Sequence, residues 1–284
     1  MKRNTSMIAV LSLLFLRYAL GGLALPLVGE AHGGEPEASA PTPPPGDYRP
    51  NDTTYRARYL TRARIKIDGV AGESEWSKAN VEKRFSFPWN SKTPAPATEF
   101  RAMCDDAWLY VTFRAEDADI VLLDKLRDKE DAVFEDRVEM IFSRDRGLKD
   151  YRCLEIDSRG RVFDYRAAFY RRFDSTWSWP GIEAAGSTFK GGYVVELRIP
   201  AHSFETLGLG RLRPGARVLW GLYRAEFSHD RSGRRVVQRE TLHNRGRKVE
   251  GPPPLEDWMS WIDPKTPEPD FHVPSSLGWL EIVE

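Results

Sequence analysis

Residues 98–116 read TEFRAMCDDAWLYVTFRAE, and apolar and polar side chains alternate on both sides of Asp105-Asp106. This alternation has the period of two that is typical of a half-buried strand. The acidic pair fits the turn between two such strands. The stretch therefore predicts a β-hairpin with one face in a core.

The same period continues on both sides of this hairpin. Alternating apolar residues recur at 138–142 and 193–197, and more runs rich in β-forming residues lie at 152–156, 161–165, 218–227 and 279–283. Turn sequences separate them, at Ser158-Arg159-Gly160, Gly191-Gly192 and Pro214-Gly215. Helical periodicity is limited to 73–80 and 200–207, while 122–134 fits either a short helix or a charged loop. We therefore predict an all-β fold, an antiparallel β-sandwich (jelly-roll or immunoglobulin-like) with few short helical turns.

The charge of the chain is balanced. Its 284 residues include 42 Lys and Arg and 42 Asp and Glu, so the formal net charge at pH 7 is zero. A nucleic-acid groove usually needs a field of one sign, and we therefore expect no nucleic-acid partner. The basic stretch at 229–257 is expected to be a solvated loop, with contact to acidic sugars as the alternative.

The N-terminal region predicts export. Lys2 and Arg3 precede two apolar stretches, and Gly29-Glu30-Ala31 resembles a signal-peptidase site. The alternative is a membrane anchor at 7–28, which would place Arg17 near the middle of the bilayer. We expect a signal peptide at 1–31, a Pro-rich tether at 32–54 and one domain at 55–284. The mature domain would be secreted, periplasmic or extracellular, without membrane contact.

The sequence holds two cysteines, Cys104 and Cys153, both in strand-like runs. Secretion would permit a disulfide between them, and two buried thiols are the alternative.

The sequence contains none of the common catalytic signatures. Metalloprotease, P-loop, dinucleotide and GxSxG patterns are absent, and the five histidines lie far apart in sequence. We therefore name no catalytic residue and no required cofactor. A structural calcium ion is the one metal kept open, because several acidic residues could supply its oxygen ligands: Asp105, Asp106, Asp117, Asp119, Glu135 and Asp136.

Aromatic residues suggest a different function. Neutral sugars are held by flat aromatic faces together with fixed polar groups. Trp108, Trp220 and Trp279 lie in strand runs and are expected in the core. Trp177 and Trp179 lie in a loop-like sequence and fit either a core or a binding role.

An ordered series of motifs across 61–284 resembles the family 9 carbohydrate-binding modules, in the free-standing branch of the DOMON-like β-sandwich superfamily. The series begins with Ile67-Asp68-Gly69, followed by Glu75-Trp76, and continues with Asp105 to Val111. Its later members are Glu135 to Phe142, Gly192 to Glu196 with Ile199-Pro200, and Ser260-Trp261 with Pro269 to Pro274 and Leu277-Gly278.

The resemblance implies a sugar-binding sandwich that often co-operates with enzymes degrading plant polysaccharides. In xylanase-attached members two Trp rings clamp a terminal sugar, and these positions fall on Phe134 and Phe271. Phenyl rings offer a smaller stacking area and no N–H donor, so a different site shape is expected. Glu139 and Arg152 match two polar positions of the family. They would orient the sugar by charge-assisted hydrogen bonds, with a structural ion pair as the alternative.

The leading prediction is a secreted, non-catalytic protein that binds poly- or oligosaccharide and supports carbohydrate catabolism, in partnership with polysaccharide-degrading enzymes. One alternative is a glycoside hydrolase or accessory domain acting through a carboxylate pair. Another is a structural or interaction domain whose sugar site has decayed. A haem-binding branch of the superfamily would require a His or Met pair facing the iron.

Overall fold

The computed structural model describes residues 41–43, 45–46, 48–49, 51–92, 94–228 and 255–284. The predicted signal peptide at 1–31, most of the predicted tether at 32–54 and the basic stretch from 229 to 254 lie outside the described residues. Within the described part, no helix is both long and apolar enough to cross a membrane.

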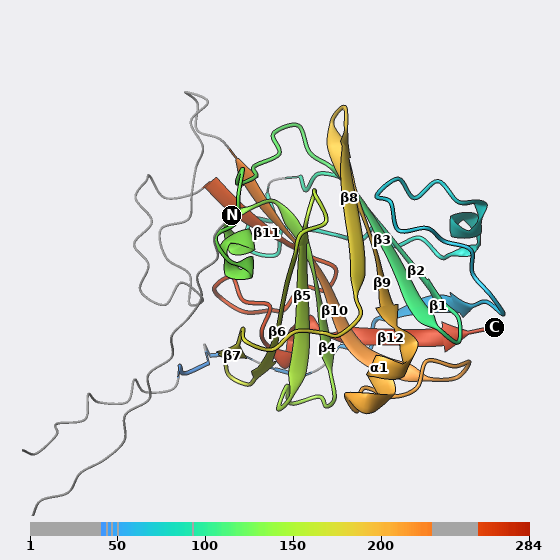
Figure 1. Ribbon diagram of the computed structural model, residues 1–284. Coiled ribbons are helices and arrows are strands. Elements are labelled where there is room, and N and C mark those ends of the chain that lie inside the picture. Colours follow the sequence, from blue (N-terminus) through green and yellow to red (C-terminus); the bar gives the residue numbers. More distant parts are fainter. Residues whose placement is uncertain (1–40, 44, 47, 50, 93, 229–254) are drawn as a thin grey trace, which may run out of the picture. The chain divides into compact units, whose positions relative to one another are not determined.

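The described chain forms a sheet of twelve strands (Figure 1). The strands are β1 (Thr54–Tyr59), β2 (Thr98–Cys104), β3 (Trp108–Glu116), β4 (Arg137–Ser143), β5 (Tyr151–Asp157), β6 (Val162–Ala168), β7 (Arg172–Asp174), β8 (Glu183–Phe189), β9 (Gly192–Pro200), β10 (Arg217–Ser228), β11 (Leu255–Ser260) and β12 (Gly278–Val283). Their spatial order is β7-β6-β5-β4-β10-β12-β1-β2-β3-β9-β8, and β11 pairs with β10. The helices are short: η1 (Ser74–Lys78), η2 (Lys129–Phe134), α1 (Ala201–Thr206) and η3 (Pro274–Ser276).

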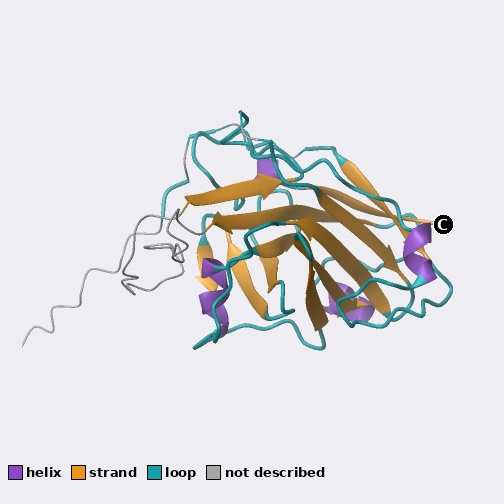
Figure 2. Ribbon diagram, turned by 90° about the horizontal axis from the view of Figure 1, so that it is seen from above, coloured by secondary structure: helices purple, strands orange, loops and turns teal. Residues whose placement is uncertain are grey.

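The sheet curls back on itself, so that β4, β5 and β10 face β2, β3 and β9 across a central core (Figures 1 and 2). Strand alternation explains this core. Phe100 and Phe113 point inward from the predicted hairpin, fully buried, and Phe100 meets Trp220 of β10 with ring centroids 5.3 Å apart. The sandwich prediction is confirmed.

One pairing differs from a purely antiparallel sandwich. Strand β1 runs parallel to both of its neighbours, β12 and β2, and so joins the two layers. All other strand pairs are antiparallel. The predicted turns place Gly160, Gly191 and Gly215 at φ of +77°, +93° and +85°, a region that glycine enters without strain.

The structure also decides between alternatives for several side chains. Cys104 and Cys153 are free thiols, since Cys104 belongs to the central core and Cys153 to a cluster on another face of the sheet. Trp220 is fully buried, as expected, whereas Trp108 and Trp279 are only half-buried. Trp177 and Trp179 pack on the central core, with Trp179 buried.

Candidate functional site

The face of β4, β5, β6 and β10 that points away from the central core carries a second hydrophobic cluster, which we call the aromatic face. Its side chains alternate with those of the central core along each strand. Helix η2 and the chain between β11 and β12 cover it. The buried members are Ala132, Val133, Phe134, Ile141, Leu148, Tyr151, Cys153, Phe163, Tyr165, Ala167, Tyr223, Phe271 and Leu277.

The structure brings Phe134, Phe271 and Glu139 together at this face. Phe134 is the last residue of η2 and Phe271 lies between β11 and η3, so their meeting depends on tertiary structure. Glu139 points to the same side from β4. All three are nearly covered, with exposed fractions of 4–5%.

Phe271 is enclosed by other aromatic rings. It stacks on Tyr223 with centroids 4.2 Å apart and an interplanar angle of 19°. The rings of Trp89 and Trp258 also contact it, with centroid distances of 5.5 and 5.3 Å. Unlike Phe271, both tryptophans are half-buried and offer ring surface to solvent. They are therefore the better placed stacking residues, although neither lies in one of the motifs that led to Phe134 and Phe271.

Arg152 lies apart from these residues. On β5 it alternates with Cys153, which belongs to the aromatic face, and shares the opposite side with Leu154 of the central core. Its guanidinium pairs with Asp150 and lies 5.1 Å from the ring centroid of Trp177. The predicted pairing of Glu139 with Arg152 on one sugar is therefore not formed.

Arg137 takes the place of Arg152 beside Glu139. Its guanidinium is 2.7 Å from the Glu139 carboxylate and 2.6 Å from that of Glu155, and all three side chains are at least 94% buried. Tyr165 donates a further hydrogen bond of 2.9 Å to Glu155. Two carboxylates thus share one guanidinium beneath the aromatic side chains.

This arrangement changes the acidity of Glu139. Burial and the nearby Glu155 carboxylate raise the pKa of Glu139 to about 8, although Arg137 acts in the opposite direction. Protonation of one carboxylate leaves one negative and one positive charge in the buried group. The charge balance therefore agrees with the direction of the shift.

A pH dependence of stability follows from this shift. Glu139 has an ordinary pKa of 4.5, so between about pH 4.5 and 8 the folded protein keeps a proton that the unfolded chain releases. The free energy of unfolding is therefore expected to fall as pH rises through this window, by at most about 1.4 kcal/mol per pH unit. Urea unfolding at several pH values would measure the slope.

Glu139→Gln keeps the shape of the neutral acid and should make this dependence less steep, while other buried carboxyl groups such as Glu226 keep their own contribution. Glu281→Gln is the matched control, because Glu281 pairs with Arg56 at the surface and its side chain is 30% exposed. Equal slopes in Glu139→Gln and the unaltered protein would contradict the assignment.

The segment that carries Phe271 is held by its own polar contacts. Asp270 accepts hydrogen bonds of 2.5 Å from Tyr170, 2.8 Å from the Arg171 side chain and 2.8 Å from the backbone of His272. Nδ1 of His272 lies 3.1 Å from the hydroxyl of Tyr151. These contacts fix the edge of the aromatic face around Phe271.

A group of carboxylates lies elsewhere, where β3, β4 and β10 meet. Asp117, Asp136 and Glu226 each place an oxygen within 4.8 Å of the other two. Two of them, Asp117 and Asp136, were among the residues that the sequence suggested for calcium. Buried Arg224 contacts Glu226 and lies 3.8 Å from Oδ2 of Asp117.

The group carries more negative than positive charge when it is ionised. Burial raises the pKa of all three carboxyl groups, that of Glu226 to about 7. Oδ2 of Asp117 is buried and accepts no hydrogen bond from the described residues. Carboxylate oxygens at this spacing are of the kind that calcium prefers, with Arg224 as a competing cation.

Comparison with known proteins agrees with this architecture. The profile of a family described as carbohydrate family 9 binding domain-like matches residues 67–248. No curated protein sequence matches the chain.

Solved structures are similar in fold at low sequence identity. One is a family 9 carbohydrate-binding module from Caldicellulosiruptor kristjanssonii in complex with cellotriose, with 17% identity, 81% of this chain and 94% of that chain covered, and a TM-score of 0.50. The complex of such a module from the same organism with glucose has 18% identity, covers 81% of this chain and 95% of its own chain, and has a TM-score of 0.47. A proposed carbohydrate-binding protein from Bacteroides uniformis has 15% identity, with 82% of this chain and 100% of that chain covered, and a TM-score of 0.57.

Proposed function

This chain belongs to the carbohydrate family 9 binding domain-like family, and we propose that it binds β-linked gluco-oligosaccharides at the aromatic face without catalysing their cleavage. The observation that carries the proposal is the pair of half-buried tryptophans, Trp89 and Trp258, that both contact the ring of Phe271. Sugar rings present C–H faces that stack on such indoles. A similar fold in complex with cellotriose supports the choice of ligand.

The polar groups beside these rings suit recognition better than hydrolysis. A glycosidase needs two carboxyl groups free to act on opposite sides of a glycosidic bond. Glu139 and Glu155 instead share Arg137 and are almost completely buried. We propose that these two residues, through Arg137, hold the side chains of the aromatic face in place.

Calorimetric titration of the purified protein with cellotriose tests the proposal, with manno- and xylo-oligosaccharides and a pectic fragment as comparisons. Saturable binding of cellotriose is expected. A folded protein that binds none of these sugars would instead favour the interaction domain whose sugar site has decayed. Release of reducing ends from the same sugars would favour the hydrolase.

We also propose that the module is exported, with residues 1–31 removed and the chain from residue 32 up to β1 acting as a tether that holds the module near polysaccharide-degrading enzymes. The basic and apolar pattern of the first 31 residues supports export. N-terminal sequencing of the secreted protein would test it, and an intact Met1 in that material would count against cleavage.

We propose that the group of Asp117, Asp136 and Glu226 binds a structural calcium ion. A bound ion would stabilise the fold by linkage, by about 2.7 kcal/mol at one hundred times its Kd. For a domain of this size we expect Tm to rise by about 5–10 °C on adding calcium and to return on chelation. Differential scanning calorimetry would measure both changes.

Asp117→Asn is the matched variant, since it removes one carboxylate and keeps the side-chain shape. Its Tm should respond much less to calcium than that of the unaltered protein. If calcium does not change the Tm of the unaltered protein, Arg224 is the cation that balances the negative charge of the three carboxylates, and the calcium proposal fails.

A further inference from the structure

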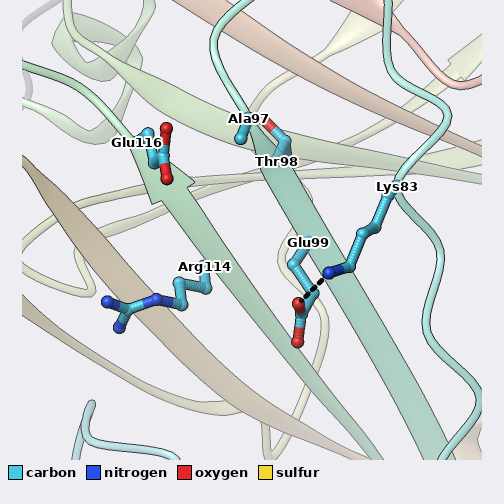
Figure 3. A pocket seen from close by; sticks show the side chains of 6 residues that line it. All are labelled: Lys83, Ala97, Thr98, Glu99, Arg114 and Glu116. Atoms are coloured by element: carbon cyan, nitrogen blue, oxygen red, sulfur yellow. Dashed lines mark ion pairs between the residues drawn. The ribbon is translucent and has the colours of Figure 1, made fainter.

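Two adjoining cavities lie on the outer face of β2, β3 and β9, in the layer opposite the aromatic face. The larger, of about 250 Å³, is lined by Val70, Trp76, Arg101 and Thr112 among others. The smaller, of about 150 Å³, is lined partly by Lys83, Thr98 and Glu116 (Figure 3). Glu99 and Arg114 line both, so the two cavities form one depression.

The depression arises from incomplete cover of the sheet. The chain before β2 packs Ile65 and Trp76 onto Met103 and Tyr110, which point outward from β2 and β3. Further along β3, the outward-facing positions are Thr112, which is covered, and Arg114, which is exposed. Polar side chains therefore line a hollow beside a small apolar cluster.

Thr112 gives the first indication of a ligand. The residue is only 5% exposed, and its hydroxyl has no hydrogen-bond partner among the described residues. A buried polar group without a partner costs about 1–3 kcal/mol. A partner such as water or a ligand atom would remove this cost. Thr112 is one of the residues that line the larger cavity, and its hydroxyl oxygen is covered in the free protein, so a ligand atom would reach it only after the Thr112 side chain turns towards the cavity.

The charges around the depression give the second indication. Glu99 is neutralised by Lys83 at 3.0 Å and Arg101 at 2.5 Å, which hold the pKa of Glu99 below its ordinary value against the effect of burial. Arg114 points away from Glu99 (Figure 3) and lies over the ring of Phe189 at 3.9 Å.

Arg114 forms no ion pair with any carboxylate in the part of the chain that the structure describes. Glu116 is the remaining acidic group at the rim. Three cationic and two anionic side chains thus line the two cavities, and Arg114 is the cation left for a ligand.

We propose that this depression binds a single acidic sugar ring, of the uronic acid type, through its carboxylate. The guanidinium of Arg114 would pair with the carboxylate and the Thr112 hydroxyl would bond to a ring hydroxyl. The two joined cavities, of about 250 and 150 Å³, lie at the lower end of the roughly 300–1,000 Å³ range of small-molecule sites, which suits a ligand as small as one sugar ring. The proposal stands independently of gluco-oligosaccharide binding at the aromatic face.

NMR titration of the purified protein with galacturonate tests the proposal, with galactose and acetate as the neutral and ring-free comparisons. Galacturonate is expected to bind at least about tenfold more tightly than either. Arg114→Met should weaken galacturonate binding by about tenfold or more, as expected for loss of a charged hydrogen bond. Arg217→Met is the matched control, because Arg217 also lies over a ring, that of Trp279 at 4.3 Å.

Thr112→Val is a test whose expected result cannot be explained by loss of folding. It removes a hydroxyl without a partner and keeps the volume, so the free protein should be as stable as before or more so. Galacturonate binding should still weaken. Galactose or acetate binding as tight as galacturonate, or unaltered binding by Arg114→Met and Thr112→Val, would overturn the proposal. Cellotriose binding should be unchanged in both variants, which separates this site from the aromatic face.

Discussion

Replacing Arg137 with Met is expected to lower the free energy of unfolding by about 3–5 kcal/mol, the cost of removing one partner from a buried ion pair. The Arg137 side chain is 3% exposed and is the only cation within 4 Å of the Glu139 and Glu155 carboxylates among the described residues. It also donates to the backbone oxygens of Val133 and Glu135 at 2.9 and 3.2 Å. Its loss would leave the buried carboxyl groups of Glu139 and Glu155 and two backbone carbonyl groups without this donor.

Urea unfolding at neutral pH would measure the loss. Arg217→Met is the control for the change in residue type, since Arg217 is exposed. Adding Glu139→Gln and Glu155→Gln to Arg137→Met removes the unbalanced charge and should recover a large part of the stability. A loss below about 1 kcal/mol would show that water already solvates these groups. No recovery in the triple variant would show that the loss comes from packing and from the backbone hydrogen bonds of Arg137 and not from unbalanced charge.

The same contacts link the charged group to the aromatic face. Val133 and Glu135 lie on either side of Phe134, so the two bonds from Arg137 fix the end of η2 where that ring enters the cluster. Phe134→Ala and Phe271→Ala would remove buried rings, which costs about 3–5 kcal/mol. These variants therefore report packing as well as binding.

Local pattern was sufficient to predict most of the sheet. The alternation in 98–116 and its counterparts at 138–142 and 193–197 reappears as β2, β3, β4 and β9. Strand β1 was missed, because its parallel pairings join Arg58 to Met103 and Thr54 to Trp279. Such pairings depend on distant segments and leave no mark in a short window of sequence.

The site was predictable only in part, because its residues also come from distant segments of the chain. Motif positions led to Phe134, Glu139 and Phe271, which share one face. Arg152 was assigned to that face, although its strand parity places it on the other. The register of β5 against β4, which pairs Glu139 with Glu155 and Phe142 with Arg152, decides the question. Neither strand shows this register alone.

Trp258→Ala and Trp89→Ala are expected to weaken cellotriose binding by at least about 30-fold each, or roughly 2 kcal/mol, as for aromatic anchors at binding sites. Trp279→Ala is the matched control, because Trp279 is also half-buried and contacts an Arg side chain but lies on β12, outside the aromatic face. Calorimetry would give the affinities, and Tm would show that each variant is folded. Affinities equal to that of Trp279→Ala would remove both indoles from the site. A loss of affinity in Trp258→Ala and Trp89→Ala but not in Trp279→Ala would place the sugar on the two half-buried tryptophans, which pack on Phe271.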